Sequence, residues 1–290
     1  MNQLFKNQKY VQDTFDEYLG NEALSSSDLK DVLKCPALFL FNQQKKKESQ
    51  EEKNDEKRHY AIGSALHEAI LEPHLFKNHY MVVPKIDRRT NAGKQEYANF
   101  LWQAKMNNSV IINEEEMVLI TNMAKSAQEN TTFISIIQNS YREVSIYAED
   151  EETGLAVRIR PDIMPKTMST ICDLKTCVSA QPKKFKNDAY NYSYGQSAAF
   201  YCDVTGREHY IFAAFEKTPP YSMALYQLND DMIDFGRANY RMALDAVKWC
   251  QEKDHWPNYV QFEVWKECYA LQDLDNYFET LEKSNLIHLL

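Results

Sequence analysis

Val157-Arg158-Ile159-Arg160-Pro161-Asp162 and Thr170-Ile171-Cys172-Asp173-Leu174-Lys175 are the two stretches that decide the fold predicted for this chain. Side chains of a β-strand alternate between its faces, so Asp173 and Lys175 share one face of the second stretch. Two short neighbouring strands would bring Asp162 beside this pair. Carboxylates suit a hard cation such as Mg²⁺ or Mn²⁺, and a lysine on the same face can reach the same phosphate. The pattern therefore predicts a metal-dependent site for phosphodiester hydrolysis.

Each half of this pattern is common by itself. An Asp-x-Lys tripeptide is more often a solvated strand edge than a catalytic pair, and Pro-Asp before a loop is usually a turn. The combination is more specific: Pro161-Asp162, a short spacer, and an apolar strand that ends in Asp173-Leu174-Lys175. In this order the chain resembles the PD-(D/E)xK nuclease superfamily. The fold expected from the resemblance is a central mixed β-sheet flanked by helices, in the α/β class.

The composition indicates a globular chain with a sizeable core. Of 290 residues, 44% are hydrophobic and 12% are aromatic, and only 7 are Gly and 9 are Pro. No apolar run approaches the length of a membrane helix and the N-terminus has no signal-peptide core, so we expect a cytoplasmic protein without a membrane partner. The six cysteines are scattered without a Cys-x-x-Cys pair, which argues against zinc ribbons, iron–sulfur clusters and a disulfide framework.

The net charge of −9 restricts how the chain can meet nucleic acid. Phosphate binding favours a basic surface, whereas acidic metal ligands add to the negative count, so we expect DNA contact in a groove rather than over a basic face. The hydroxyl of Ser27 lies at a predicted helix N-terminus, where it can hold a terminal phosphate as well as cap the helix. The other candidates for DNA contact are Arg158, Arg160, Lys183 and Lys184.

The chain shows no internal repeat, and we expect one nuclease domain over residues 25–290, preceded by a peripheral arm at 1–24. The mixed charges of residues 45–58 indicate a solvated segment without chemistry. From about residue 260 a helical, aromatic-rich tail is expected, either as an oligomer contact or packed on its own domain.

Local signals predict several elements around the two stretches. Ser25 and Asp28 fit a capping box that starts a helix, which Cys35-Pro36 ends. Asn113 and Glu116 fit the cap of a second helix. Further elements are expected at residues 209–215 and 222–226 as strands and at residues 230–252 as a long amphipathic helix.

Further matches make the resemblance sharper, since the chain is similar to the RecE (exonuclease VIII) type of phage recombination exonuclease. The likeness runs in preserved order from about residue 25 to residue 259. It rests on Gly63-Ser64-Ala65-Leu66-His67 with Leu71-Glu72-Pro73, Arg158-Ile159-Arg160-Pro161-Asp162 with Asp173-Leu174-Lys175-Thr176, Ser27-Asp28-Leu29 before Cys35-Pro36-Ala37-Leu38-Phe39, and Trp256-Pro257-Asn258-Tyr259.

The resemblance implies a set of metal ligands. His67 alone would be read as a histidine at the edge of the core, but in the family the histidine of this helix is a ligand, which joins it to Asp162 and Asp173. The backbone carbonyl of Leu174 is a further candidate ligand. From the residues alone, a surface role and a site role for Glu143 are comparable, and the resemblance favours the site, where Glu143 would help to place a second ion or its water.

The resemblance also implies catalytic residues outside the ligand set. Lys175 would orient or deprotonate the attacking water and stabilise charge on the phosphate. Family members carry a glutamine followed by a tyrosine one helical turn later near the active site, for which Gln196 and Tyr201 are the candidates. These two residues are five positions apart here, so Ser197 stands in the glutamine place if Tyr201 is the aligned residue.

The activity implied by the resemblance is 5′-to-3′ digestion of linear double-stranded DNA with Mg²⁺, for which Mn²⁺ is expected to substitute. The implied partners are double-stranded DNA ends, a single-strand annealing recombinase of the RecT type, and further copies of the chain in a ring, as a trimer or tetramer. One alternative is another nuclease of the superfamily, either an endonuclease or a CRISPR-adaptation type, although the latter lacks support without a cysteine quartet. The other is an inactive DNA-binding protein, against which the complete acid, acid and lysine set argues.

Overall fold

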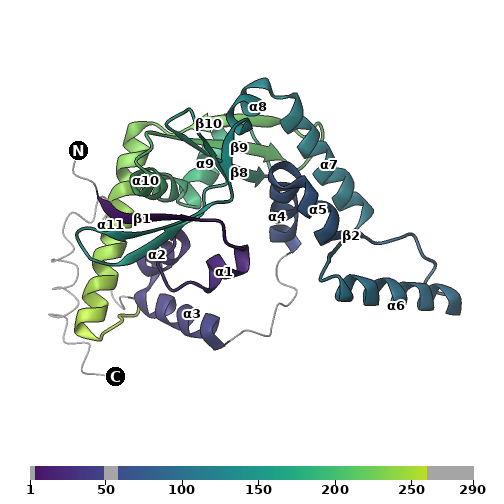
Figure 1. The fold of residues 1–290 in the computed structure, drawn as a ribbon, viewed down its shortest axis with the longest axis horizontal. Helices are drawn as coiled ribbons and strands as arrows, with labels where there is room; N and C mark the ends of the chain where they lie inside the picture. Colours follow the sequence, from purple (N-terminus) through teal and green to yellow (C-terminus); the bar gives the residue numbers. More distant parts are fainter. Residues whose placement is uncertain (1–3, 49–57, 260–290) are drawn as a thin grey trace.

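The computed structural model describes residues 4–48 and 58–259, and a five-stranded sheet lies at its centre (Figure 1). Its strand order is β10-β9-β8-β7-β4. The strands are β4 (Ser140–Arg142), β7 (Ile163–Pro165), β8 (Thr170–Cys177), β9 (His209–Glu216) and β10 (Met223–Gln227). Strands β8 and β9 are parallel and the other neighbours are antiparallel, so the predicted central mixed sheet is confirmed.

Two smaller sheets accompany the central one. A two-stranded parallel sheet pairs β2 (Tyr80–Val82) with β3 (Val110–Ile112). A three-stranded antiparallel sheet has the order β1-β5-β6. Its strands are β1 (Phe5–Val11), β5 (Ser145–Asp150) and β6 (Ala156–Ile159).

The N-terminal segment corrects one prediction, because it is not a peripheral arm. Strand β1 pairs with β5 from Phe5 opposite Asp150 to Val11 opposite Ser145, and Phe5 is completely buried. Helix α1 (Phe15–Gly20) follows with its own capping box. The strand has little apolar patterning because most of its side chains face solvent, so its place depends on backbone hydrogen bonds to β5 and on one buried ring.

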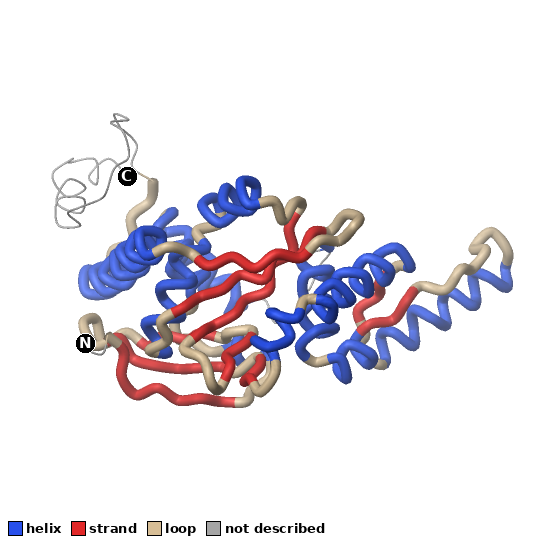
Figure 2. Tube along the Cα trace, turned by 90° about the horizontal axis from the view of Figure 1, so that it is seen from above, coloured by secondary structure: helices blue, strands red, loops and turns tan. Residues whose placement is uncertain are grey.

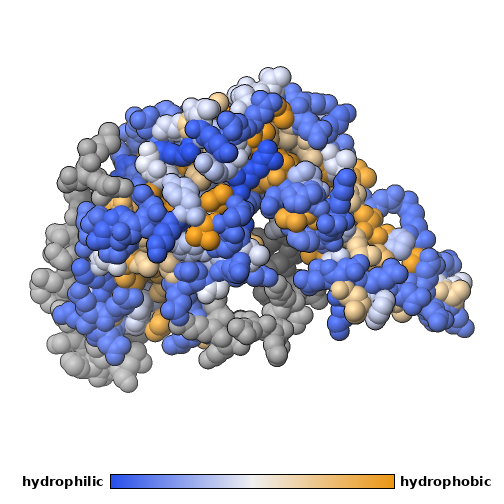
Figure 3. All heavy atoms as spheres, in the orientation of Figure 1, coloured by the Kyte–Doolittle hydropathy of each residue, from blue (hydrophilic) through white to orange (hydrophobic). Residues whose placement is uncertain are grey.

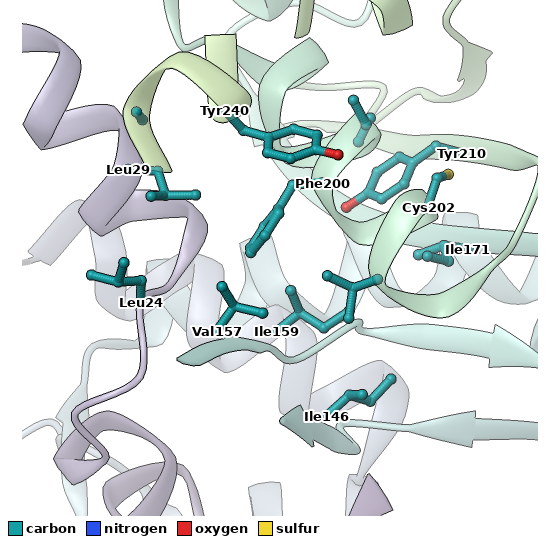
Figure 4. Packing of buried hydrophobic residues seen from close by; sticks show 14 of the residues in the cluster. Leu24, Leu29, Ile146, Val157, Ile159, Ile171, Phe200, Cys202, Tyr210 and Tyr240 are labelled. Atoms are coloured by element: carbon teal, nitrogen blue, oxygen red, sulfur yellow. The ribbon is translucent and has the colours of Figure 1, made fainter. Parts of the chain in front are cut away.

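Helices cover both faces of the central sheet, as predicted. Ile171 of β8 packs in the cluster that contains residues of α2, α10 and α11, whereas Cys172 and Leu174 pack in the cluster that contains residues of α4, α7 and α8. The first cluster is shown in Figure 4. The helices are α2 (Ser26–Lys34), α4 (Arg58–Leu71), α7 (Glu114–Glu129), α8 (Thr131–Ile137), α10 (Tyr194–Thr205) and α11 (Asp230–Lys253).

Four helices or helical turns complete the described part, and Figure 2 shows one of them, α6, extending away from the central sheet. The four are α3 (Pro36–Glu48), α5 (Pro73–His79), α6 (Asn91–Met106) and α9 (Pro182–Asn191). The face seen in Figure 3 is largely hydrophilic. Among residues 4–48 and 58–259, the longest helices lack the apolar length required to span a bilayer.

Both predicted helix caps are confirmed. The Ser25 side chain accepts the backbone N–H of Asp28 and the Asp28 carboxylate accepts that of Ser25, and Asn113 with Glu116 does the same at α7. The long helix and the two late strands are also found where predicted. The predicted tail from residue 260, and most of the charged segment, lie outside the described residues.

Candidate active site

The candidate site forms where β7 and β8 separate. These strands pair only at Ile163 and Cys172. Beyond this pair, the backbone N–H of Leu174 donates to the Asp162 carboxylate at 2.7 Å. A side-chain oxygen thus takes the place of a strand neighbour, because a buried N–H needs an acceptor. This hydrogen bond holds the Asp162 carboxylate, which is almost fully buried, beside the backbone of β8.

A histidine and two carboxylates meet at this opening. The Nδ1 atom of His67, on α4, lies 3.6 Å from Oδ2 of Asp162 and 3.8 Å from Oε1 of Glu143. Its Nε2 atom lies 3.1 Å from the carbonyl oxygen of Leu174. The possible ligand atoms of His67, Glu143 and Asp162 all lie within 4.8 Å of one another. One imidazole and two carboxylates suit a divalent cation, so the side chains that are present fit the predicted metal.

The backbone at Glu143 directs its side chain into this group. Glu143 lies between β4 and β5 with a φ of 50°, which is uncommon for a residue with a side chain. Its N–H donates to the carbonyl of Asp162 at 3.2 Å. Arg160 Nε donates to Glu143 Oε2 at 3.0 Å, which leaves Oε1 toward His67. Arg160 Nη1 also donates to Asp13 Oδ1 at 3.0 Å, so the segment after β1 supports the site indirectly.

The two arginines predicted to contact DNA are used inside the protein. Arg158 is 3% exposed, and its guanidinium donates to the carbonyl oxygens of Tyr18 and Asn21. Arg160 has the contacts to Glu143 and Asp13 given above, and its side chain is nearly buried. The prediction was wrong because α1 and the segments on either side of it, together with Glu143, occupy both guanidinium groups.

Asp173 and Lys175 form an ion pair on β8. Among the described residues, the group of ligand atoms within 4.8 Å does not include Asp173. Burial lowers the pKa of Lys175, but the charges of Asp173 and Asp162 outweigh burial and leave this pKa raised. Lys175 is therefore a cation at neutral pH. Its Nζ lies 5.5 Å from the centre of the Tyr194 ring.

The orientation of α10 shows which of Gln196 and Ser197 lies toward the candidate site. Residues three and seven positions apart share a helix face, so Tyr194, Ser197 and Tyr201 point to the same side. This side faces the site, since the ring of Tyr194 lies 5.5 Å from Nζ of Lys175. Ser197 Oγ lies 3.0 Å from Ser26 Oγ, which joins α10 to α2. Gln196 points the other way and is buried, and this placement argues against a catalytic role for it.

Proton binding and cation binding compete at the candidate ligands. Burial has the largest effect on the pKa of both Asp162 and His67. It raises the pKa of Asp162. For His67 burial is outweighed by the carboxylates of Asp162 and Glu143, so its pKa is raised as well. A histidine must be neutral to bind a metal ion, so a cation at this site would release protons.

The remaining predicted DNA contacts are exposed. Ser27 lies on the surface of α2, and Lys183 and Lys184 lie on the surface of α9. Lys30 lies near Asp173 and Lys175 but is not among the predicted residues. It lies on α2 with its Nζ donating to the carbonyl of Tyr192 at 3.0 Å. Its sequence neighbours gave no signal, because its site partners lie more than a hundred positions later in the chain.

A mixed sheet that opens beside Asp162, Asp173 and Lys175 defines the PD-(D/E)xK class of fold. The family described as "PDDEXK-like domain of unknown function (DUF3799)" matches residues 25–266, and the chain belongs to this family. The predicted superfamily is thereby confirmed. No curated protein sequence matches the chain significantly.

One solved structure shares this fold over most of both chains. A protein from Eubacterium rectale described as "Putative exonuclease" aligns with a TM-score of 0.59 at 12% identity, covering 91% of this chain and 98% of that one. A phage-related exonuclease from Haemophilus somnus 129PT aligns with a TM-score of 0.28 at 12% identity, covering 66% and 94%. An alkaline exonuclease from Laribacter hongkongensis gives 0.27 at 12% identity, covering 66% and 97%. The first of these supports the assigned fold.

Proposed function

We propose that this protein is a Mg²⁺-dependent exodeoxyribonuclease that hydrolyses phosphodiester bonds. The observation that carries the proposal is the position of His67, Glu143 and Asp162 directly beside the Asp173–Lys175 pair of β8. Three potential ligands for a cation and one cationic side chain adjoin the same stretch of backbone. This combination suits a reaction in which a phosphate gains negative charge while water attacks it.

Each residue has a definable part in this chemistry. His67, Glu143 and Asp162 would hold the cation, with Asp173 and the carbonyl of Leu174 next to them. A bound divalent cation supplies Lewis acidity to the phosphate and lowers the pKa of water.

Lys175 completes the set as a charged hydrogen-bond donor to the phosphate oxygens. The raised pKa of Lys175 favours this role over removal of a proton from water, since a general base must be unprotonated.

The resemblance to RecE-type exonucleases suggests the direction of digestion and the DNA substrate. We propose 5′-to-3′ digestion of linear duplex DNA, leaving 3′ single-stranded tails for an annealing recombinase of the RecT type. The Eubacterium rectale protein described as an exonuclease supports the exonuclease class. A ring-shaped homo-oligomer, a trimer or tetramer, would keep the enzyme on its DNA, and Mn²⁺ is expected to replace Mg²⁺.

Digestion of 5′-labelled linear duplex DNA, with closed circular DNA alongside, tests the proposal. Release of nucleotides from linear DNA only, with Mg²⁺ and not with EDTA, is the expected result. The Asp173→Ala and Lys175→Ala proteins should lose it. Lys166→Ala is the matched control, because Lys166 also lies over a tyrosine ring, that of Tyr141 at 4.7 Å. Cutting of the circle would indicate an endonuclease, and a folded, metal-binding protein that cuts nothing would indicate a DNA-binding protein.

A further inference from the structure

Lys30 lies beside the candidate site but is not one of its metal ligands. It is on α2, three positions after Ser27, so the two side chains are neighbours on one helix surface. Its Nζ donates to the carbonyl oxygen of Tyr192, at the C-terminus of α9. The lysine therefore bridges from α2 to the start of the segment that leads into α10.

Lys30 lies close to the Asp173–Lys175 pair. Burial lowers its pKa to about 8, and the charge of Lys175 contributes in the same direction. Asp173 acts in the opposite direction, but this carboxylate is already paired with Lys175. Among the described residues no carboxylate forms an ion pair with Lys30 itself, so an anion from outside the protein could pair with it.

Two exposed tyrosines lie at the end of α9 that Lys30 contacts. Tyr192 is 62% exposed, and its ring stacks on that of Tyr194 at 5.9 Å. Tyr190 is 71% exposed. It lines a hollow of about 390 Å³ between α9 and the start of α11, together with Lys186, Asn187, Asn191 and Met232. Aromatic faces, amides and a lysine are the groups that bind bases and phosphates of single-stranded nucleic acid.

We propose that Lys30, Tyr192, Tyr190 and this hollow form a binding site for a single DNA strand that leads away from the metal ligands. Lys30 contacts a phosphate next to the reacting one, and bases stack on Tyr192 and Tyr190. The proposal depends on the proposed function for the position of the reacting phosphate. Binding of the strand itself can be measured without cleavage.

Binding of a fluorescein-labelled oligothymidylate, followed by fluorescence anisotropy in EDTA, tests the site. Stacking on an aromatic side chain is worth about tenfold in affinity, so Tyr190→Ala and Tyr192→Ala should each weaken binding about tenfold. Lys30→Ala should weaken binding and lower the slope of log affinity against log salt by about one, because one phosphate contact is lost. A purely structural lysine would leave this slope unchanged.

Two matched controls come from the same chain. Lys34→Ala removes the next lysine on α2, which pairs with Asp31 at the surface. Tyr141→Ala removes a tyrosine that is 46% exposed on β4. Both should bind within about twofold of the unchanged protein. Equal losses in the controls, or an unchanged salt slope for Lys30→Ala, would overturn the inference.

Cleavage of linear DNA by the same proteins separates the two proposals. If the unchanged protein cleaves DNA while the Lys30, Tyr190 and Tyr192 variants bind the oligonucleotide normally, the inference fails and the proposed function stands. If the unchanged protein cleaves nothing while these variants lose binding as expected, the strand site stands and the proposed function fails. Circular dichroism verifies that each variant is folded.

Discussion

The candidate site has two sides, or flanks, next to β8, and the two differ in charge and in the kinds of side chain that they contain. On one flank, His67, Glu143 and Asp162 gather potential ligands for a cation. On the other, Lys175 and Lys30 lie beside tyrosines of α9 and α10. The candidate metal ligands thus lie toward α4, and the lysines proposed to contact phosphate lie toward α2, α9 and α10.

The net charge of the chain therefore does not indicate the local charge on either flank. The chain carries a charge of −9, yet Lys30 and Lys175 lie close enough beside its candidate site for the charge of Lys175 to lower the pKa of Lys30. Arg158, predicted to contact DNA, instead donates hydrogen bonds to backbone carbonyls, and Arg160 pairs with acidic side chains. Local contacts, and not the total charge, decide where a polyanion can approach. The predictions below test each flank, starting with the largest effect.

Asp162→Asn should have the largest effect. The asparagine keeps an acceptor for the N–H of Leu174 but loses the charge that holds a cation. Loss of an outer partner of a metal ligand costs about 10–100-fold in affinity, and loss of a ligand itself should cost at least as much. Isothermal titration with Mn²⁺ measures this change. Asp150→Asn is the control, since Asp150 is also buried but pairs with Arg241. Unchanged Mn²⁺ affinity in Asp162→Asn would remove Asp162 from the ligand set.

Substitutions of Arg158 and Arg160 should affect different properties: the first the stability of the fold, the second the affinity for Mn²⁺. Arg158→Ala leaves buried carbonyls without a donor and should lower the free energy of unfolding by about 3 kcal/mol, with little change in Mn²⁺ affinity of the folded protein. Arg160→Ala frees Glu143 from its hydrogen bond and should weaken Mn²⁺ binding about tenfold, with partial rescue in Arg160→Lys. Urea unfolding and titration measure the two effects. Tighter Mn²⁺ binding in Arg160→Ala would mean that the arginine charge opposes the cation more than it orients Glu143.

The effect of metal on stability should grow with pH. The raised pKa of His67 means that its protonated form stabilises the fold below its ordinary pKa of 6.5, and that this contribution is lost as pH rises through the raised value. Ionisation of buried Asp162 acts with the same sign. A cation replaces these protons, so the increase in melting temperature with Mn²⁺ should be larger at about pH 9 than at about pH 6. An equal increase at both pH values would contradict the role of His67.

Gln196→Met should have the smallest effect. The Gln196 side chain is buried and its Nε2 has no hydrogen-bond partner among the described residues, so an apolar residue of similar size removes an unsatisfied donor. Cleavage should stay within about twofold, and the melting temperature should stay equal or rise. A loss of activity of tenfold or more, measured with linear duplex DNA, would return Gln196 to the catalytic set.

The sequence predicted what depends on short spacing. Alternation along β8 placed Asp173 and Lys175 on one face, and the capping box at Ser25 placed the start of α2. Both follow from local geometry. The family resemblance supplied His67 and Glu143, which lie far from Asp162 in the sequence.

Features that depend on distant packing could not be predicted. Arg158 has the pattern of an exposed residue on a strand, but α1 and its following loop provide carbonyls that bury it. Strand β1 has too few apolar residues to be recognised without its partner β5. Gln196 and Ser197 were indistinguishable until the face of α10 toward β8 was known.

Anomalous diffraction from crystals soaked in Mn²⁺ tests the central claim most directly. The account predicts one strong anomalous peak at about 2 Å from the carboxylates of Asp162 and Glu143 and from a ring nitrogen of His67. The peak should disappear in Asp162→Asn crystals. A protein that cleaves DNA with Mn²⁺ but shows its peak elsewhere, or shows none beside these three residues, would contradict the assignment of the metal site.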